Sequence, residues 1–429
     1  MGLILPIRAE FTPWRDTEDP FCGVKALGRA VFLSPHPTAN SGGNIRKGLS
    51  TMSSRYASAA TAALALAILP AWWGHPRAPI SPPAHPVMIL GSRVPLGESA
   101  APNSQPVKQA AAKNSPPAKH PGPQKSAPTP LVLGYYVPGA SALADLEAHA
   151  SSMNAIAPFW YALRINGTLH DMGSSASLTQ WCRAHHIAVY PMVINGYGND
   201  NILQSSAYFR QDLTDLIRLA ATPGYAGLNI DFESLNNRDE APLDRFVASL
   251  ASALHHEGKK LIVSVGPRTS RQNGYHVYSY RHLGASADYV DLMLYDEHDN
   301  GGASGPVAGL AWARAIVSYA RQTIPRGKIL VGLAGYGYDW ASTGSIEIND
   351  REALAFGRRY GVQWVGGSVE EPEITYSVSG VEHVVWFEDS ASEAYKARWV
   401  AQYGLGGVAL WDLGEENPAV WPMLKRVLP

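Results

Sequence analysis

Gly-Leu-Asn-Ile-Asp-Phe-Glu at residues 227–233 is the stretch that decides how this chain folds. Successive side chains of a β-strand point to opposite faces, so Asn229, Asp231 and Glu233 share one face and the apolar residues share the other. The apolar face requires a core, and the polar face must then line a cavity. Because two neighbouring carboxyls that lack hydration resist full ionisation, one of them should keep a proton near neutral pH. Such a group can act as a general acid.

The same two carboxyls have a purely structural alternative. Asp231 and Glu233 would then cap the helix that follows, or form a hydrogen-bonded pair without chemistry. A short motif cannot separate these two interpretations, so the pattern of the rest of the chain has to decide.

Seven further β-rich runs accompany this strand. The eight runs are residues 131–137, 155–163, 187–194, 225–233, 260–267, 289–297, 328–336 and 405–413. Segments with helical periodicity lie between them, at 142–152, 177–185, 206–220, 243–257, 308–322 and 390–403. Near-continuous apolar strands that alternate with helices predict a parallel sheet, and eight such units predict an α/β fold closed into a (β/α)8 TIM barrel. A doubly wound open sheet is the alternative.

The interval between the seventh and eighth runs is too long for one helix. Within it, EITYSVSGVEHVVWFED at residues 373–389 has the alternation and the central glycine of a β-hairpin. We therefore predict a small α+β insertion at about 340–389. It would stand at the end of the barrel where the active sites of this fold lie.

The first 130 residues differ from the rest in composition. Residues 52–75 have a basic start and an Ala/Leu-rich stretch, which predicts a signal sequence or a membrane anchor. Trp72 and Trp73 suit a membrane interface, and this favours retention over cleavage. The Pro/Ala-rich residues 76–130 predict a disordered linker. Residues 1–51 are expected to be an unstructured N-terminal segment, either a cytoplasmic tail or sequence upstream of a true start at Met52.

Composition limits the classes of function. Of the 429 residues 46% are hydrophobic and the formal net charge is -1, which favours a globular core over a nucleic-acid surface. The two cysteines, Cys22 and Cys182, predict neither a disulfide framework nor a cysteine-rich metal site. Adjacent histidines at 185–186 and 255–256 would point in different directions on a helix. We expect no metal and no cofactor.

Aromatic and acidic residues gather near the C-terminal ends of the predicted strands. Tyr135 and Trp160 belong to the first two strands, Tyr295 and Asp296 to the sixth, and Trp411 to the eighth. These ends of a parallel barrel meet at one rim, so the side chains should surround the polar face of residues 227–233. Aromatic faces beside carboxyls suit sugar rings. For any single aromatic residue, a place in the core is the alternative.

These motifs resemble those of glycoside hydrolase family 18, the chitinase-like enzymes. GLNIDFE is similar to the strand-four DxxDxDxE motif, MLYDEH at 293–298 to the strand-six MxYD motif, and GVALWDLG at 407–414 to the strand-eight tryptophan motif. The resemblance covers about 131–428 and includes the insertion. It is nearer to bacterial members found beside or fused to polysaccharide deacetylases than to secreted chitin degraders.

The resemblance implies a substrate-assisted retaining mechanism, in which the sugar's own 2-acetamido oxygen attacks the anomeric carbon. By motif, Glu233 protonates the leaving oxygen and then activates water, while Asp231 orients the acetamido N–H. Tyr295 would bind the acetamido oxygen, and Trp411 would form the floor beneath the sugar. The further expected substrate-binding residues are Asp296, Tyr135, Trp160, Asn229 and His298.

One position departs from the family's pattern. Where the family has an Asp beneath Asp231, this chain has Asn229, which removes a negative charge. An Asn can hydrogen-bond Asp231 but cannot take a proton from it, so we expect an altered pH dependence with activity retained. The Asp that opens the longer motif has no clear counterpart either.

Three functions are considered from these residues. The favoured one is hydrolysis of β-linked N-acetylglucosamine glycans, with peptidoglycan or poly-N-acetylglucosamine preferred over chitin because a tethered enzyme acts close to its own envelope. A lectin-like glycan-binding protein on the same barrel would not need Glu233, and an envelope scaffold would need none of the motif residues. We expect a monomer, exported to the periplasm or cell surface and anchored in the inner membrane if the signal is retained.

Overall fold

The computed structural model describes residues 129–428, with gaps at 197–198, 273, 362 and 365–369. The expectations for residues 1–51 and 52–75, and for all but the end of the linker at 76–130, lie outside the described residues. Within these bounds, every helix is too short or too polar to span a bilayer.

The parallel strands of the described residues close into a ring. They are β1 (Leu131–Tyr136), β2 (Ala155–Leu163), β5 (Met192–Ile194), β6 (Gly227–Asp231), β7 (Lys260–Val265), β8 (Tyr289–Leu292), β9 (Ile329–Ala334) and β15 (Gly407–Trp411). Their order is β1-β15-β9-β8-β7-β6-β5-β2, and β2 pairs again with β1. This closure confirms the predicted (β/α)8 TIM barrel and excludes the open sheet. The short β3 (Leu169–Asp171) and β4 (Ala188–Val189) also pair with β2.

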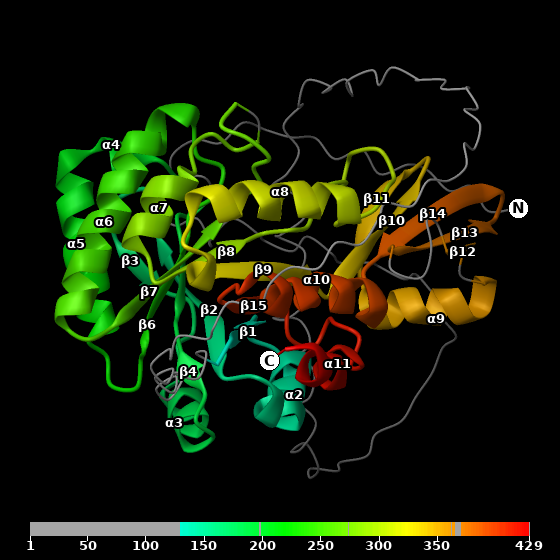
Figure 1. The fold of residues 1–429 in the computed structure, drawn as a ribbon, viewed down its shortest axis with the longest axis horizontal. Helices are drawn as coiled ribbons and strands as arrows, with labels where there is room; N and C mark the ends of the chain where they lie inside the picture. Colours follow the sequence, from blue (N-terminus) through cyan, green and yellow to red (C-terminus); the bar gives the residue numbers. More distant parts are fainter. Residues whose placement is uncertain (1–128, 197–198, 273, 362, 365–369, 429) are drawn as a thin grey trace, which may run out of the picture. The chain divides into compact units, whose positions relative to one another are not determined.

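Helices between the strands cover the outside of the barrel (Figure 1). They are α2 (Ala140–His149), α3 (Ala176–Ala184), α4 (Asn201–Gln204), α5 (Ser206–Ala220), α6 (Glu240–His256), α7 (Tyr280–Ser286), α8 (Leu310–Thr323), α10 (Ser390–Tyr403) and α11 (Val420–Val427). Single 3-10 turns lie at η2 (Ala150–Ser152), η3 (Asn237–Asp239) and η4 (Arg326–Lys328). The side chains of Ser205 and Asp389 accept backbone N–H groups at the first turns of α5 and α10. These caps explain why both helices begin where the sequence predicts.

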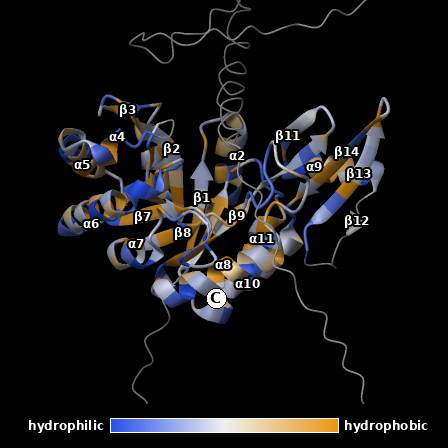
Figure 2. Cartoon of the chain, turned by 90° about the horizontal axis from the view of Figure 1, so that it is seen from above, coloured by the Kyte–Doolittle hydropathy of each residue, from blue (hydrophilic) through white to orange (hydrophobic). Residues whose placement is uncertain are grey.

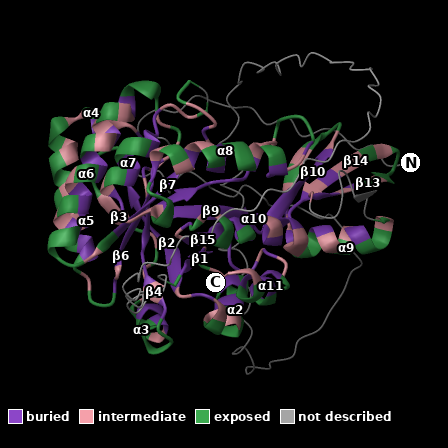
Figure 3. Cartoon of the chain, viewed as in Figure 1, coloured by how far each residue is buried: buried purple, intermediate pink, exposed green. Residues whose placement is uncertain are grey.

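Apolar side chains form two separate layers on the two faces of the barrel strands. The outer layer, between strands and helices, includes Leu228, Ile230 and Phe232 of the deciding stretch. The inner layer includes Leu133, Tyr135, Ala157, Met192, Ile262, Leu330 and Ala409. Figure 2 shows apolar residues concentrated on the strands, and Figure 3 shows that these strands are buried. The alternation of a β-strand thus places Asn229 and Asp231 inside the barrel.

The third predicted strand is broken in two. Residues 187–194 form β4 and β5 instead of one continuous strand, with Tyr190 and Pro191 between them. A proline has no N–H to donate to a neighbouring strand, so the ladder is interrupted there. The carbonyl oxygen of Pro191 still accepts a hydrogen bond from the Asn229 N–H, at 3.0 Å, which keeps the chain beside β6.

The insertion after the seventh barrel strand is a five-stranded antiparallel sheet with one helix (Figure 1). Its elements are β10 (Tyr336–Ala341), β11 (Gly344–Asn349), α9 (Asp350–Tyr360), β12 (Gln363–Trp364), β13 (Pro372–Val378) and β14 (Val381–Phe387). The predicted hairpin is β13–β14, and its turn residues Ser379 and Gly380 both have positive φ, as a tight hairpin turn requires.

The insertion begins four residues earlier than the predicted residue 340. Tyr336, expected to end the seventh barrel strand, starts β10 instead. Gly335 separates β9 from β10, and a Cβ there would lie 2.8 Å from the backbone nitrogen of Glu416. The chain passes so close to residue 416 that only a glycine fits, and this contact was not visible in the local pattern.

Candidate active site

The deciding stretch presents its polar residues inside the barrel, as its alternation predicts. Asn229 and Asp231 on β6 are 0% and 5% exposed, and the apolar neighbours pack outward against the helices. Glu233 follows the end of β6 and is half-buried. It therefore stands at the C-terminal rim, where the barrel interior opens.

The backbone around Glu233 is held by two residues that the sequence analysis missed. Asn195, which follows β5, accepts the Glu233 N–H at 2.9 Å through Oδ1 and donates to the Glu233 carbonyl at 2.8 Å through Nδ2. The hydroxyl of Tyr278 donates to the carbonyl of Phe232 at 2.7 Å. These bonds fix residue 233 although it lies outside the strand. Asn195 could have been found because it directly follows a predicted strand, like the other rim residues.

The two carboxyls of the stretch share a hydrogen bond, and burial raises the pKa of each. Burial, then the charges of Glu233 and Asp291, raise the pKa of Asp231 well above its usual range. Burial, then the charge of Asp296, raise the pKa of Glu233 to about 7. Among the described residues, no lysine, arginine or histidine forms an ion pair with either carboxyl. A proton on this pair is therefore retained near neutral pH.

Asp296 is fixed by tyrosines from the insertion. Its backbone has φ 61°, in the left-handed region, and its Oδ1 accepts the hydroxyls of Tyr336 at 2.7 Å and Tyr338 at 2.8 Å. The ring of Tyr295 meets that of Tyr336 edge-on, with 6.1 Å between centroids. Tyr295 is buried. Burial, then the charges of Asp291, Asp231 and Glu233, raise its pKa well above the usual range. The insertion thus contributes a wall to the mouth of the barrel.

Trp411 ends the last barrel strand at the same mouth. Trp411 is half-buried, and its ring lies 5.3 Å from the ring of Tyr135 and 6.5 Å from that of Phe159, measured between centroids. The peptide that joins it to Asp412 is cis. Trp411 also packs on the aromatic cluster of the insertion that contains Tyr338. An aromatic face is thereby placed over the barrel interior, which suits a sugar ring.

Comparison with known proteins identifies the family. The model of glycosyl hydrolases family 18 matches residues 173–416. The chain belongs to glycosyl hydrolase family 18. It is thus a glycosidase of the chitinase-like group, as its motifs predict.

Proteins similar to this family 18 chain include a glycosylase, a lytic enzyme and a chitinase. An uncharacterized glycosylase, YvbX, of Bacillus subtilis (strain 168) is 28% identical over 326 residues, which are 69% of this chain and 91% of the relative. The cortical fragment-lytic enzyme of Bacillus anthracis is 26% identical over 288 residues, 63% of this chain and 66% of that enzyme. The crystal structure of a chitinase from Chromobacterium violaceum ATCC 12472 superposes with a TM-score of 0.65 at 33% identity, covering 69% of this chain and 98% of the other.

One residue expected to bind substrate lies elsewhere in this family 18 barrel. Trp160 is 1% exposed and packs in the outer layer, with its ring 6.2 Å from that of Tyr225. The alternation of β2 puts Ala155, Ala157 and Phe159 on the inner face, so Trp160 points outward like Ile156. Phe159 is consequently the residue of β2 that packs with Trp411. The prediction for Trp160 was wrong because the two-residue period of the strand places Phe159, and not Trp160, on the inner face.

Two further expected residues of the family 18 site make contacts that were not foreseen. Asn229 donates through Nδ2 to the Ser264 hydroxyl at 3.0 Å, and no hydrogen bond joins it to Asp231 among the described residues. His298 lies half-buried in the loop after β8, where its Nδ1 is 2.9 Å from the carbonyl oxygen of Pro306. His298 is thereby tied to its own loop.

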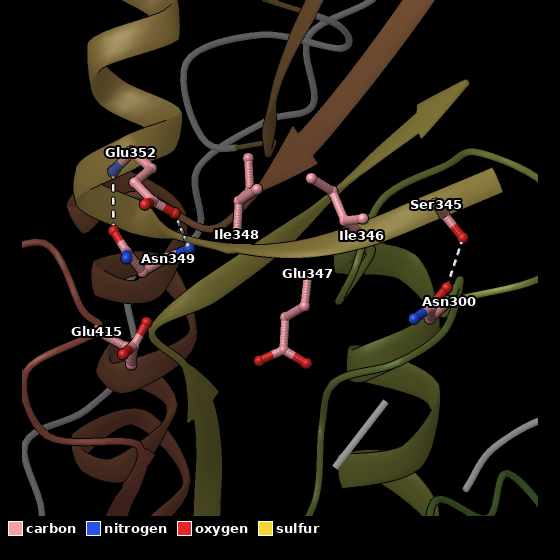
Figure 4. Close-up of a pocket in the computed structure, with 8 residues that line it drawn as sticks. All are labelled: Asn300, Ser345, Ile346, Glu347, Ile348, Asn349, Glu352 and Glu415. Carbon is pink, nitrogen blue, oxygen red and sulfur yellow. Dashed lines mark hydrogen bonds between the residues drawn. The ribbon is translucent and has the colours of Figure 1, made fainter. Parts of the chain in front are cut away.

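A cavity of about 350 Å³ opens between the insertion and the loop after β8 (Figure 4). It is lined by Asn300, Ser345, Ile346, Glu347, Ile348, Asn349, Glu352 and Glu415. Burial, then the charges of Asp296 and Glu415, raise the pKa of Glu347 to about 7. Glu347 pairs with Tyr338, whose hydroxyl donates to Asp296, so this cavity adjoins the family 18 site. In the part of the chain that the structure describes, no cluster of three or more His, Cys, Asp or Glu residues is arranged to hold a metal.

Proposed function

We propose that this family 18 glycosidase cleaves β-linked N-acetylglucosamine glycans by a retaining, substrate-assisted reaction with Glu233 as the acid and base. The observation that carries the proposal is the state of the Glu233 carboxyl. It is half-buried at the barrel mouth, its pKa is raised to about 7, and it is hydrogen-bonded to a second carboxyl, Asp231. A proton donor near its own pKa at neutral pH meets the requirement of general-acid catalysis.

The geometry of the pair favours the substrate as the nucleophile. In the two-carboxylate schemes, the carboxyls stand on opposite sides of the scissile bond, about 5 Å or more apart. Asp231 and Glu233 come from the same face of one strand and share a hydrogen bond, so they approach the bond from one side. The 2-acetamido oxygen of the sugar is then the nucleophile closest to the anomeric carbon.

The proposed steps follow from this arrangement. Glu233 gives its proton to the leaving glycosidic oxygen while the acetamido oxygen forms a bond to C1, and the ring closed in this way carries a positive charge. Asp231 accepts a hydrogen bond from the acetamido N–H and stabilises that charge, and the Tyr295 hydroxyl would donate to the acetamido oxygen. Glu233, now a carboxylate, removes a proton from the water that attacks C1, and the bond between C1 and the acetamido oxygen breaks, which restores the neutral acetamide. Trp411 would support the sugar ring from below.

The substrate class follows from the acetamido group. A sugar with a free 2-amino group lacks the proposed nucleophile, so acetylated glycans are required. Peptidoglycan and poly-N-acetylglucosamine are the preferred candidates, and chitin-like chains the third. The similarity to cortical fragment-lytic enzymes and to a chitinase supports this class. We also propose that the protein acts outside the cytoplasm, in the periplasm or at the cell surface, which cell fractionation would test.

The test uses the full-length protein with N-acetylglucosamine oligomers, their deacetylated counterparts and peptidoglycan. Acetylated chains should be cut, deacetylated chains should not, and product masses should identify the bond cleaved. Glu233→Gln should abolish turnover and leave binding of the acetylated oligomer intact, because the amide keeps the shape but carries no transferable proton. Substantial hydrolysis by that variant would remove Glu233 from its proposed role. Binding without turnover by the wild-type protein would favour the lectin-like alternative.

A further inference from the structure

A second buried acid, Asp291, lies inside the barrel beside the catalytic stretch. It interrupts the apolar strand β8, is 0% exposed, and accepts the Tyr135 hydroxyl through Oδ2 at 2.7 Å. The strand pairing aligns Ser264 of β7 with Asp291 on one side, and Val263 with Ile230 on the other. Asp231, one residue beyond Ile230, therefore flanks Ser264 on the side opposite Asp291, two strands away.

Register partners on neighbouring strands point to the same side of the sheet, so Asp231 and Asp291, which both align with Ser264, point into the barrel interior. The two are close enough for the charge of Asp291 to raise the pKa of Asp231. One oxygen of each, and Oδ1 of Asn229, have no hydrogen-bond partner among the described residues. The interior thus holds acceptors in excess of donors, and a proton kept on a carboxyl relieves this excess.

A chain of hydrogen bonds with one direction links Asn229 to Asp291. The single hydrogen of the Tyr135 hydroxyl goes to Asp291, so the Ser264 hydroxyl, 2.8 Å away, must donate to Tyr135. Ser264 in turn accepts from the Asn229 amide at 3.0 Å. Every donor in this chain points towards Asp291. An ionised Asp at position 229 could not start such a chain, because a carboxylate has no hydrogen to give.

We propose that Asp291 carries the negative charge that the family motif places at position 229, and that Asn229 orients the hydrogen bonds that keep Asp291 ionised. Compared with the family motif, the negative charge therefore lies on β8 instead of β6. Asp291 is a positioning residue: it touches no substrate and acts through Asp231. The proposal rests on the function proposed for Asp231 and Glu233.

The consequence is a proton held more firmly on the catalytic pair. Burial raises the pKa of Asp291 to about 7 and the Tyr135 hydrogen bond opposes this rise, so Asp291 is ionised above that pH. A like charge nearby disfavours ionisation, so ionised Asp291 makes the Asp231–Glu233 pair retain its shared proton. Other titratable groups also face this interior from the elements around it. They are Tyr135 on β1, Tyr278 after β7, and Tyr295 and Asp296 after β8. The tyrosine hydroxyls stay neutral in the working range because burial raises their pKa values.

The size of the effect follows from the strand spacing. Two intervals of about 4.8 Å place the charges roughly 10 Å apart. With an effective dielectric constant of about 20, one charge at this distance shifts the pKa of the other by about one unit. Asp291→Asn, which keeps the size of the side chain, should therefore lower the upper pH limit of kcat/KM by about one pH unit.

The experiment compares pH profiles of kcat/KM on an acetylated oligomer for the full-length wild type, Asp291→Asn, and the double variant Asn229→Asp with Asp291→Asn. The single variant should lose activity at a lower pH than the wild type, and the double variant should recover part of the shift because the charge is restored beneath Asp231. Asp212→Asn is the matched control. Asp212 lies on α5, is also fully buried, and has a pKa that burial raises to about 7, so its profile should not move.

A profile of Asp291→Asn that superimposes on the wild type overturns the proposal. If that variant does not fold, Ser264→Ala takes its place, since it breaks the chain of donors and should move the limit in the same direction by a smaller amount. An unmoved limit in Ser264→Ala would count equally against the proposal. An inactive wild type would instead refute the proposed function, and the two failures are therefore distinguishable.

Discussion

A buried lysine joins the insertion to the barrel, and its removal gives the sharpest stability prediction. Lys396 on α10 is 1% exposed, and its ammonium contacts Glu388 and lies 3.7 Å from Glu371. Glu371 also accepts the backbone N–H groups of Val307 and Ala308, each at 2.6 Å. One cation therefore holds the end of the insertion against the loop that follows β8.

Lys396→Met keeps most of the apolar stem and removes the charge. Two buried carboxyls then lose their cation, and breaking a buried ion pair from one side costs about 3–5 kcal/mol. Unfolding entropy is about 2.1 cal/mol/K per residue, or roughly 0.6 kcal/mol/K for about 300 folded residues. The expected loss in Tm at pH 7 is therefore about 5–8 °C.

Circular dichroism melts at pH 7 and pH 5 are the assay. Burial already raises the pKa of Glu371 and Lys396 opposes this rise, so the variant's carboxyl should bind a proton more readily. The native state of the variant then holds a proton that the unfolded chain loses as the pH rises. The fall in Tm relative to the wild type should therefore be smaller at pH 5 than at pH 7. Lys425→Met, at an exposed site, is the control and should change Tm little. An equal loss at both pH values would refute the charge argument and point to packing instead.

Two further predictions concern a buried acid and the tyrosines at the rim. Glu393 on α10 is fully buried, and burial, then the charge of Asp350, raise its pKa well above the usual range. The native state therefore holds a proton that the unfolded chain loses, stability falls as the pH rises above about 4.3, and Glu393→Gln should flatten the dependence of Tm on pH between 5 and 8. A slope identical to the wild type would contradict this reasoning. Replacing Tyr336 and Tyr338 together by Phe removes both hydrogen bonds to Asp296, so kcat/KM should fall roughly tenfold, the equivalent of about 1.4 kcal/mol. Steady-state kinetics that match the wild type would show that Asp296 needs no such support.

Much of the fold followed from the sequence because its signals are local. The apolar runs gave all eight barrel strands, and residues 155–163, 206–220 and 390–403 gave β2, α5 and α10 with the observed bounds. A strand alternates with period two and a helix with period 3.6 whatever surrounds them, so the face of each element can be read from its own residues. The same rule put Asp231 inside the barrel and Glu233 at its rim.

Tertiary structure alone decided which of these side chains meet. The bulge in β2 put Tyr161 in the outer layer next to Trp160, so Phe159 is the last ring of this strand that faces the barrel interior. The pairing of β7 with β6 and β8 placed Asp231 and Asp291 on either side of Ser264, although 60 residues of chain separate them. Register and bulges depend on how a strand fits its two neighbours, which no single stretch of sequence specifies. The sequence therefore determined the barrel and its acid, while the packing of strand against strand determined the electrostatic environment of that acid.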